Sequence, residues 1–385
     1  MAPMGIQGRT WCLVWAISMV IILFTSDLVR GHRSNGNMNV IDSCWRTNPN
    51  WRRNRHQLAT CSVGYAGKMS NNVGRGTVDY VVTDPSDDPS NPKPGTLRFG
   101  VTSVKGKVWI TFQRDMNIKL AKPLLVGSFT AIDGRGANVH ITNGACLLLQ
   151  EVSNVIIHGI HIHDCIAQGA GPVIGPDRKM VQLGPVDGDA IRLVSSSKIW
   201  IDHNTLQDCH DGLIDVTRGS TDITISNNWF KFQDKVMLLG HDDGFSLDKN
   251  MKVTVVFNSF GPRCHQRMPR IRFGYAHVVN NLYLGWGIYA IGGSMEPSIK
   301  SQANLFIAPQ GGSKEILWGH SAIGGFKSVQ DVFENGASFS NSLARDVAMR
   351  PNYRADQSFQ VAEGRAVRLL TRSAGALRCP PTSTC

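Results

Sequence analysis

The sequence predicts an all-β protein whose strands wind into a parallel β-helix, that is, a β-solenoid. Short β-rich runs recur along the chain, and each of them ends in asparagine: IWIDHN, ITISNN, VTVVFN, HVVNN and IKSQAN. The closing asparagines follow one another at intervals of 24, 30, 23 and 23 residues: Asn204, Asn228, Asn258, Asn281 and Asn304. A near-constant interval of this size is typical of a solenoid in which each repeat forms one coil.

Two further observations favour stacked coils. Helical periodicity is scarce between Leu120 and Phe306, and earlier runs of the same kind stand at 124–134 and 154–162. Coils of a parallel β-helix stack about 4.8 Å apart, so asparagines at one corner can hydrogen-bond along the stack. The alternative is a β-sandwich, whose meanders would not predict a recurring asparagine corner.

The ends of the chain differ from this repetitive middle. Arg9 precedes the apolar run from Trp11 to Phe24, which is short for a membrane span and ends in polar residues. We therefore expect a secretion signal at 1–31, with an uncleaved anchor as the alternative, and no stable membrane insertion once the signal is removed. An N-terminal extension is expected at 32–95, the β-helix core at 96–310, and a C-terminal cap and tail at 311–385.

The overall charge suggests an anionic partner. The 385 residues include 40 lysines and arginines against 29 acids, a formal net charge of +11. Nucleic acid, a membrane surface and an acidic polysaccharide all fit such a balance. No block of five or six like charges appears, which argues against nucleic acid.

Nine cysteines fit an oxidising compartment. Cys12 would leave with the signal, and Cys209 and Cys264 are expected to stay unpaired. The simplest pairing of the others is local: Cys44–Cys61, Cys146–Cys165 and Cys379–Cys385. Zinc binding is the competing interpretation, but the chain has no C-x-x-C motif.

Four aspartates repeat with the coil interval. Asp187 and Asp211 are 24 residues apart, with Asp189 and Asp215 close to them, and Lys235 follows Asp211 by another 24. Adjacent coils would bring these carboxylates together, where they repel unless a cation is present. Oxygen ligands at a loose extracellular site suit Ca²⁺. The alternative is a set of turn aspartates beside glycines.

The stretch RCHQRMPRIRFG, residues 263–274, concentrates positive charge. Four arginines lie within it, and no acid occurs between Ser259 and Leu284. Such a cluster needs either acids elsewhere in the fold or a negatively charged substrate.

Many stretches from Cys44 to about Pro309 together resemble the plant-type pectate lyases of the parallel β-helix superfamily. They occur in the family's order: NPNWRRNRHQLATCSVGYAGKM, PGTLRFGV, IDGRGANVHI, VDGDAIRLV, IWIDHN, CHDGLIDV, ISNNWF, DKVMLLGH, QRMPRIRFG and YAIGGS. The resemblance implies a right-handed, single-stranded β-helix that cleaves de-esterified homogalacturonan with Ca²⁺. We also expect a monomer that is secreted to the cell wall, as the N-terminal segment indicates. Beyond residue 310 the match thins.

The resemblance also implies roles for single residues. Asp187, Asp211 and Asp215 would bind calcium, with Asp189 as a fourth contact. Arg267 would be the catalytic base, whereas Lys235 and Arg272 would bind substrate carboxylates. Asp202 and His203 resemble a structural segment of the family rather than its catalytic one.

The implied reaction is β-elimination, in which a base removes the proton on C5 of a uronate. A cation beside the uronate would stabilise the charge that develops. A guanidinium keeps its proton at neutral pH, so a base role for Arg267 predicts activity that rises in alkali. The alternative is that Arg267 clamps the substrate while hydroxide or water acts as the base.

Other functions remain open at this point. A polygalacturonase would hydrolyse with paired acids and needs no arginine in the cleft, and a pectin lyase would dispense with the calcium acids. A wall-binding protein without activity is a third possibility. We expect the histidines near His158 to serve packing or the surface rather than a metal, and Trp229, Trp286 and Tyr289 to pack between coils rather than to bind sugar.

Overall fold

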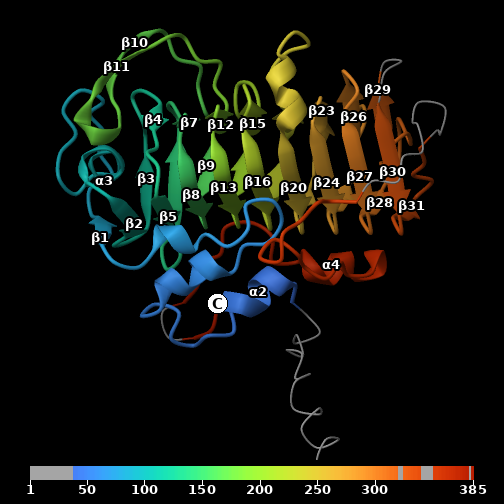
Figure 1. Cartoon of the computed structure of the whole chain (residues 1–385), viewed down its shortest axis with the longest axis horizontal. Coiled ribbons are helices and arrows are strands. Elements are labelled where there is room, and N and C mark those ends of the chain that lie inside the picture. The colour runs from blue at the N-terminus through green and yellow to red at the C-terminus, as the bar shows by residue number, and fades with distance from the viewer. Residues whose placement is uncertain (1–37, 320–323, 340–349, 381–382) are drawn as a thin grey trace, which may run out of the picture. The chain divides into compact units, whose positions relative to one another are not determined.

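The structure is a computed structural model, and it describes residues 38–319, 324–339, 350–380 and 383–385. Parallel strands wind from coil to coil and stack into three long sheets (Figure 1). The chain therefore forms the right-handed parallel β-helix that the sequence predicts. The predicted signal segment, 1–31, lies outside the described residues.

Each coil from β2 to β29 contributes one strand to each sheet, whereas the coils at the two ends contribute fewer. Sheet 1 contains, in order, β1 (Thr77–Val82), β2 (Lys107–Phe112), β5 (Thr130–Asp133), β8 (Ser153–His158), β13 (Ser197–Asp202), β16 (Thr221–Ser226), β20 (Lys252–Val256), β24 (Tyr275–Val279), β27 (Ser298–Gln302) and β30 (Gly325–Val329). Sheet 2 contains β3 (Met116–Ile118), β6 (Val139–Thr142), β9 (His161–His163), β14 (Thr205–Gln207), β17 (Trp229–Lys231), β21 (Ser259–Phe260), β25 (Leu282–Leu284), β28 (Leu305–Ile307) and β31 (Val332–Glu334). Sheet 3 contains β4 (Leu124–Leu125), β7 (Leu147–Gln150), β12 (Ile191–Val194), β15 (Ile214–Thr217), β19 (Met237–Leu239), β23 (Arg270–Arg272), β26 (Ile291–Ser294) and β29 (Leu317–Gly319).

The stacked strands extend beyond the range 96–310 expected from the sequence. β1 pairs with β2 in register from Thr77 to Val82, and β30 and β31 continue sheets 1 and 2 on the far side. β1 carries exposed side chains and no asparagine corner, which explains why the repeat pattern does not reveal it.

The corner asparagines form the ladder that their spacing predicts. Each side-chain amide donates to the side-chain oxygen of the next asparagine at 3.0–3.1 Å, from Asn204 through Asn228, Asn258 and Asn281 to Asn304. The side-chain oxygens of Asn228, Asn258 and Asn304 each accept a second hydrogen bond, at 2.8–2.9 Å. The donor is the backbone N–H of the corner asparagine on the preceding coil. All five asparagines are fully buried, so the ladder satisfies polar groups that water cannot reach.

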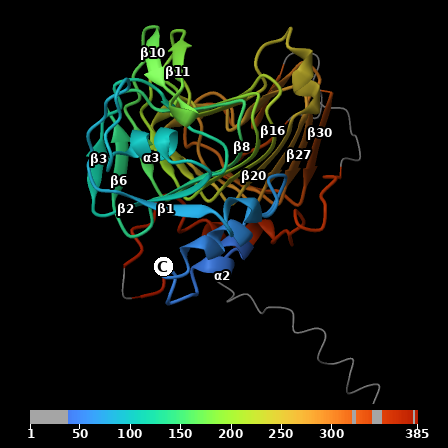
Figure 2. The ribbon, with the colours of Figure 1, turned by 60° about the vertical axis from the view of Figure 1, so that its left-hand side comes forward.

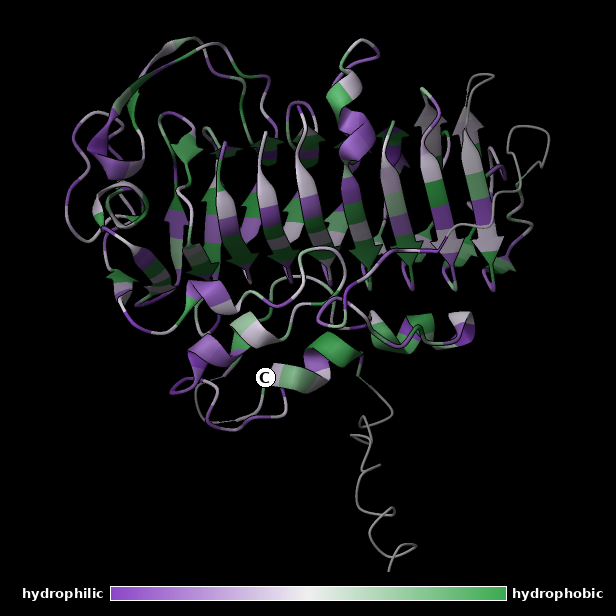
Figure 3. Cartoon of the chain, viewed as in Figure 1, coloured by the Kyte–Doolittle hydropathy of each residue, from purple (hydrophilic) through white to green (hydrophobic). Residues whose placement is uncertain are grey.

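The interior of the coils is apolar. Hydrophobic and polar residues alternate along many strands (Figure 3), because successive side chains point to opposite faces of a strand. One inward column stacks aromatic rings with centroids 4.4–5.0 Å apart: Phe230, Phe260, Tyr283 and Phe306. The column repeats once per coil, so it aligns consecutive coils.

Short helices and loops lie outside the three sheets. The N-terminal extension contains α2 (Val40–Trp45), η1 (Arg55–Thr60) and η2 (Ser70–Asn72), and its Trp45 and Trp51 pack with Trp109 and Trp200 of sheet 1. α3 (Leu97–Ser103) precedes β2, and η6 (Gly364–Ala366) and α4 (Val367–Leu370) belong to the C-terminal segment. Two insertions rise from the coils, the hairpin β10 (Gly171–Ile174) and β11 (Met180–Leu183) with η3 (Pro176–Arg178) between them, and the loop that carries η4 (Ser246–Asn250) (Figure 2).

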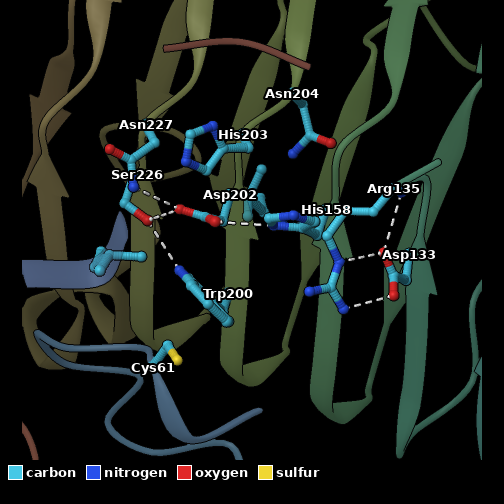
Figure 4. A network of polar contacts seen from close by, with 12 residues as sticks. Cys61, Asp133, Arg135, His158, Trp200, Asp202, His203, Asn204, Ser226 and Asn227 are labelled. Carbon is cyan, nitrogen blue, oxygen red and sulfur yellow. Dashed lines mark hydrogen bonds and ion pairs between the residues drawn. The ribbon is translucent and has the colours of Figure 1, made fainter. Parts of the chain in front are cut away.

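A buried polar network joins the N-terminal extension to the coils (Figure 4). His203 Nε2 lies 2.7 Å from Oδ1 of Asp42, and Asp202 contacts His158 at 2.9 Å. Asp133 accepts from Arg55 and Arg135 as well as from Trp109. Burial alone would raise the pKa of Asp133, but the two guanidinium groups outweigh it and lower that pKa. Asp202 and His203 thus lie in a structural network, as the resemblance implies.

Three disulfides join the pairs expected from the sequence: Cys44–Cys61, Cys146–Cys165 and Cys379–Cys385. Cys209 and Cys264 carry free thiols. Within the described part of the chain, no helix is long and apolar enough to cross a membrane.

Candidate active site

Four aspartates gather where two neighbouring coils enter sheet 3. Asp187 and Asp189 lie just before β12, Asp211 lies just before β15, and Asp215 belongs to β15. One carboxylate oxygen from each of Asp187, Asp189 and Asp211 lies within 4.8 Å of the others. The spacing of the acids therefore predicts their proximity correctly.

Gly212 allows Asp215 to face this group. A methyl group on Gly212 would stand 2.9 Å from Oδ1 of Asp189 and 2.9 Å from Oδ1 of Asp215. The backbone N–H of Gly212 donates to Asp189 at 2.8 Å. A side chain at position 212 would push the carboxylates of Asp189 and Asp215 apart, so glycine at this position allows them to lie close together.

These carboxylates lack sufficient positive charge around them. Burial, and then the charge of Asp187, raise the pKa of Asp189 to about 7. Burial, and then the charge of Asp189, raise the pKa of Asp215 well above its ordinary value. Oδ2 of Asp189 is buried without a hydrogen-bond partner in the described structure. A bound cation would stabilise a cluster of this kind, because it would supply the positive charge that the surrounding protein lacks.

Two basic side chains reach the edge of the acid cluster. Lys235 Nζ lies 2.7 Å from Oδ1 of Asp211, and Arg192 Nη1 lies 3.1 Å from Oδ1 of Asp187. When all four aspartates are ionised, they and the two basic side chains together carry a net charge of −2. One divalent cation would balance that charge. Oxygen donors without histidine or cysteine suit a hard cation, so the residues present fit Ca²⁺.

Arg267 lies one coil beyond Lys235. The strand β18 (Gln233–Lys235) pairs with β22 (Cys264–Gln266) so that Lys235 stands opposite Gln266, and the N–H of Met237 donates to the carbonyl of Arg267 at 2.7 Å. Arg267 has a φ of 62°, in the left-handed region. Burial raises the pKa of Tyr289, and the nearby charges of Arg270 and Arg267 oppose that rise. Nε of Arg267 is buried without a partner in the described structure.

The neighbouring arginines of RCHQRMPRIRFG have different partners. Arg272 Nε lies 2.9 Å from Asp243, and its Nη1 donates to the carbonyl of His241 at 3.1 Å. Arg270 lies over the ring of Trp318, 5.3 Å from its centroid. Burial, and then the charge of Arg272, lower the pKa of Arg270. Among the described residues, Arg272 is therefore the one arginine of this stretch that pairs with an acid.

Sequence reasoning did not identify Arg192 and Asp243 as part of this site. Arg192 was detectable, since it precedes Asp215 by one coil and stands opposite it in register. Asp243 lies in the loop that carries η4, which has no counterpart in the other coils, so no interval points to it. Tyr289 and Trp286 are buried at 3% and 4% exposure, in line with the expected packing role.

An acidic cluster on one coil boundary, a lysine on the next coil and arginines on the coil after that define a class of protein, the enzymes that act on acidic polymers along a parallel β-helix. Comparison with known families makes this assignment specific. Residues 52–317 match the family model described as Pectate lyase. The chain belongs to the pectate lyase family.

Known proteins of this family cover nearly the whole chain. A pectate lyase of Zinnia elegans is 48% identical and aligns with 92% of this chain and 89% of its own length. Pectate lyase 1 of Hesperocyparis arizonica is 49% identical over 88% of this chain and 94% of its own. The crystal structure of Jun a 1, the major allergen from cedar pollen, superimposes with a TM-score of 0.84 at 47% identity, over 88% of this chain and 99% of that one.

Proposed function

We propose that the protein cleaves de-esterified (1→4)-α-D-galacturonan by β-elimination, that it requires Ca²⁺, and that it releases 4,5-unsaturated oligogalacturonides. The observation that carries this proposal is the placement of clustered carboxylates on one coil boundary and of Lys235 and Arg267 on the next coils. Pectate lyase family membership supports the reaction type.

The metal would be held by Asp187, Asp211 and Asp215, with Asp189 as a further contact. When bound, Ca²⁺ would neutralise the negative charge that develops beside the uronate carboxylate. Lys235 and Arg272 would bind substrate carboxylates, since both present partly exposed nitrogen donors on the coils that follow the acid cluster.

Arg267 would remove the C5 proton. The electron pair of the C5–H bond would form the C4–C5 double bond, and the C4–O bond would break with its pair on the leaving oxygen, which then takes a proton. Three features favour this role for Arg267: its backbone in the left-handed region, its position close to the Tyr289 side chain, and the absence of an acidic partner in the described structure. A neutral guanidine is scarce at neutral pH, so the rate should rise in alkali.

We also propose that the protein is secreted to the cell wall as a monomer and that residues 1–31 are its signal. The three disulfides support an oxidising compartment.

Ultraviolet absorbance during incubation with polygalacturonate tests the function. We expect new absorbance from the unsaturated product, lost with a chelator and restored by Ca²⁺. New reducing ends without absorbance would indicate a polygalacturonase, and activity confined to methyl-esterified pectin would indicate a pectin lyase. Binding without any cleavage would indicate a wall-binding protein.

A further inference from the structure

The residue before each ladder asparagine belongs to a second column, along the corner between sheets 1 and 2. The members of this column share a φ of 51–58°, in the left-handed region: His203, Asn227, Phe257, Asn280 and Ala303. Asn227 accepts a hydrogen bond from the side chain of Asn39 at 2.8 Å. Asn280 donates to the carbonyl of Ala362 at 2.9 Å. The column therefore contacts both the N-terminal extension and the C-terminal segment, and His203 is its one titratable member.

His203 contacts both of these segments with one ring. Its Nε2 lies 2.7 Å from Oδ1 of Asp42 on α2, and its Nδ1 lies 3.1 Å from the carbonyl oxygen of Gly375 in the C-terminal segment. A carbonyl oxygen and an ionised carboxylate can only accept hydrogen bonds, so each ring nitrogen must carry a proton to satisfy both contacts. The side chain of His203 is fully buried, so bulk water cannot replace either partner.

The surrounding charges favour this second proton on the ring of His203 rather than on the carboxyl group of Asp42. Arg46 Nη1 donates to Oδ2 of Asp42 at 2.7 Å, and a guanidinium at that distance favours the carboxylate. Burial alone would lower the pKa of His203, but the charges of Asp42 and then of Asp202 outweigh it and raise that pKa. When His203 is protonated, the two acids are balanced by its ring and by Arg46.

The neighbouring His158 has a different environment. Its ring centre lies 5.5 Å from that of His203, and its Nδ1 contacts Asp202 at 2.9 Å. A single proton on Nδ1 meets this contact. Asp202 also accepts hydrogen bonds from Ser226 at 2.6 Å and from Asn227 at 3.0 Å. Burial lowers the pKa of His158, although Asp202 opposes that change. The network therefore contains two buried histidines of which one is charged and the other neutral.

We propose that His203 is an imidazolium in the folded protein and acts as a proton-dependent latch, which holds α2 and the C-terminal segment against the coils (Figure 4). When the ring releases one proton to the solvent, either Asp42 or Gly375 faces a nitrogen that no longer donates, in a place that water does not reach. The latch therefore weakens in alkali. His203 stands between β13 and β14, whereas the acid cluster lies where the coils enter sheet 3, so the latch needs neither Ca²⁺ nor substrate.

The pH dependence of unfolding tests the latch. A histidine of the unfolded chain has a pKa of about 6.5, so above that value the folded protein keeps a proton that the unfolded chain has lost. The stability that His203 contributes is therefore complete below about pH 6.5 and is lost as the pH rises from there through the raised pKa of the folded state. Within this interval the unfolding equilibrium constant of the wild type should rise by up to about tenfold per pH unit.

Two variants separate His203 from the rest of the network. In His203→Gln the rise of the unfolding equilibrium constant in alkali should be absent. His158→Gln is the matched control, because it also removes a fully buried histidine of the network yet should keep the rise. Urea unfolding at several pH values from about 7 to about 9.5 measures the curves. Parallel curves for the wild type and His203→Gln would overturn the proposal.

Nitrogen NMR of the wild type with isotope-labelled histidines measures the charge without any variant. At about pH 8 an ordinary histidine is about 3% charged. We expect one imidazole that carries protons on both nitrogens at this pH, that exchanges them slowly with water because it is buried, and that releases one of them at higher pH. If every slowly exchanging ring has a single proton at about pH 8, the proposal is wrong even if His203→Gln fails to fold.

Hydrogen exchange shows whether the charge acts on the two terminal segments. The N–H of Gly375 donates to the carbonyl of Asn227 at 2.7 Å, and the N–H of Arg46 donates to the carbonyl of Asp42 at 2.9 Å. Once intrinsic exchange rates are corrected for, protection of these two amides should fall more steeply between about pH 7 and about pH 9.5 than protection in β16 and β20. The same fall in all of them would mean that His203 stabilises the whole fold evenly, and the latch would be refuted.

Discussion

The ammonium nitrogen of Lys235 lies 2.7 Å from Oδ1 of Asp211, across the boundary between two coils. Both side chains are partly exposed, at 40% and 29%, so water screens the pair and it contributes little to stability. In the proposed function the ammonium group of Lys235 would compete with Ca²⁺, because it contacts the Asp211 oxygen that the calcium ion would use.

The first prediction concerns this competition. In Lys235→Met we expect Ca²⁺ to bind at least as tightly as in the wild type, since a competing cation is removed, whereas KM for polygalacturonate rises by about tenfold. Calorimetry with Ca²⁺ and steady-state kinetics measure the two effects. Lys231→Met is the control, because Lys231 lies over Trp229 on sheet 2, with 4.0 Å between Nζ and the ring centre. Weaker Ca²⁺ binding in Lys235→Met would contradict the competition.

The second prediction concerns the acids. Asp211→Asn and Asp215→Asn should each raise the Ca²⁺ concentration for half-maximal activity at least about tenfold, because each removes a charged ligand. Asp208→Asn, an exposed aspartate outside the cluster, should leave it unchanged. Calcium titrations of the initial rate measure the shift. Full activity of the wild type in excess chelator would refute the calcium requirement.

The third prediction separates two arginines. Arg267→Lys keeps the charge but changes geometry and hydrogen bonding, so we expect it to lose nearly all turnover while it still binds oligogalacturonate and Ca²⁺. Arg272→Lys should mainly raise KM, and wild-type activity should climb above neutral pH. Turnover of Arg267→Lys within about threefold of wild type at alkaline pH would make Arg267 a clamp and leave another group as the base.

Much of this architecture was predictable from the intervals between residues. A solenoid repeats its environment every coil, so the spacing from Asn204 to Asn304 predicts the ladder, and the spacing of Asp187 and Asp211 predicts their contact. What interrupts the repeat was not predictable in this way. The β10–β11 hairpin and the loop that carries Asp243 occur once, and their contacts depend on packing between segments that no interval relates. The strand β1 was missed because its side chains are largely exposed and no asparagine corner follows it.

The fourth prediction concerns the asparagine ladder. Asn258 accepts from the backbone and side chain of Asn228 and donates to the carbonyl of Ile225 and to Asn281. Asn258→Ala leaves several buried groups unpaired at about 1–3 kcal/mol each, so we expect a loss of about 3 kcal/mol or more in the free energy of unfolding. Urea unfolding measures it, with the exposed Asn71→Ala as the control. Equal stability of the two variants would show that the ladder contributes nothing.

The last prediction concerns acid stability and His277. This histidine is buried at 1% exposure, contacts Tyr353 and Gln302, and stands opposite Lys300 on the next strand. Burial, and then the charge of Lys300, lower the pKa of His277 to about 3. In the unfolded chain the pKa of a histidine is about 6.5.

Between these two values the unfolded chain binds the proton and the folded protein does not. His277 therefore lowers the free energy of unfolding as the pH falls from about 6.5 towards 3, by up to about 1.4 kcal/mol per pH unit, and contributes no pH dependence above 6.5. His277→Gln should be less stable at neutral pH because it disturbs the contacts with Tyr353 and Gln302, yet its stability should fall less steeply in acid. Urea unfolding at several pH values from 7.5 to about 4.5 measures both slopes, with His265→Gln as a control because that side chain is 57% exposed. Parallel curves for the wild type and His277→Gln would mean that the proton taken up on acid unfolding goes to other groups.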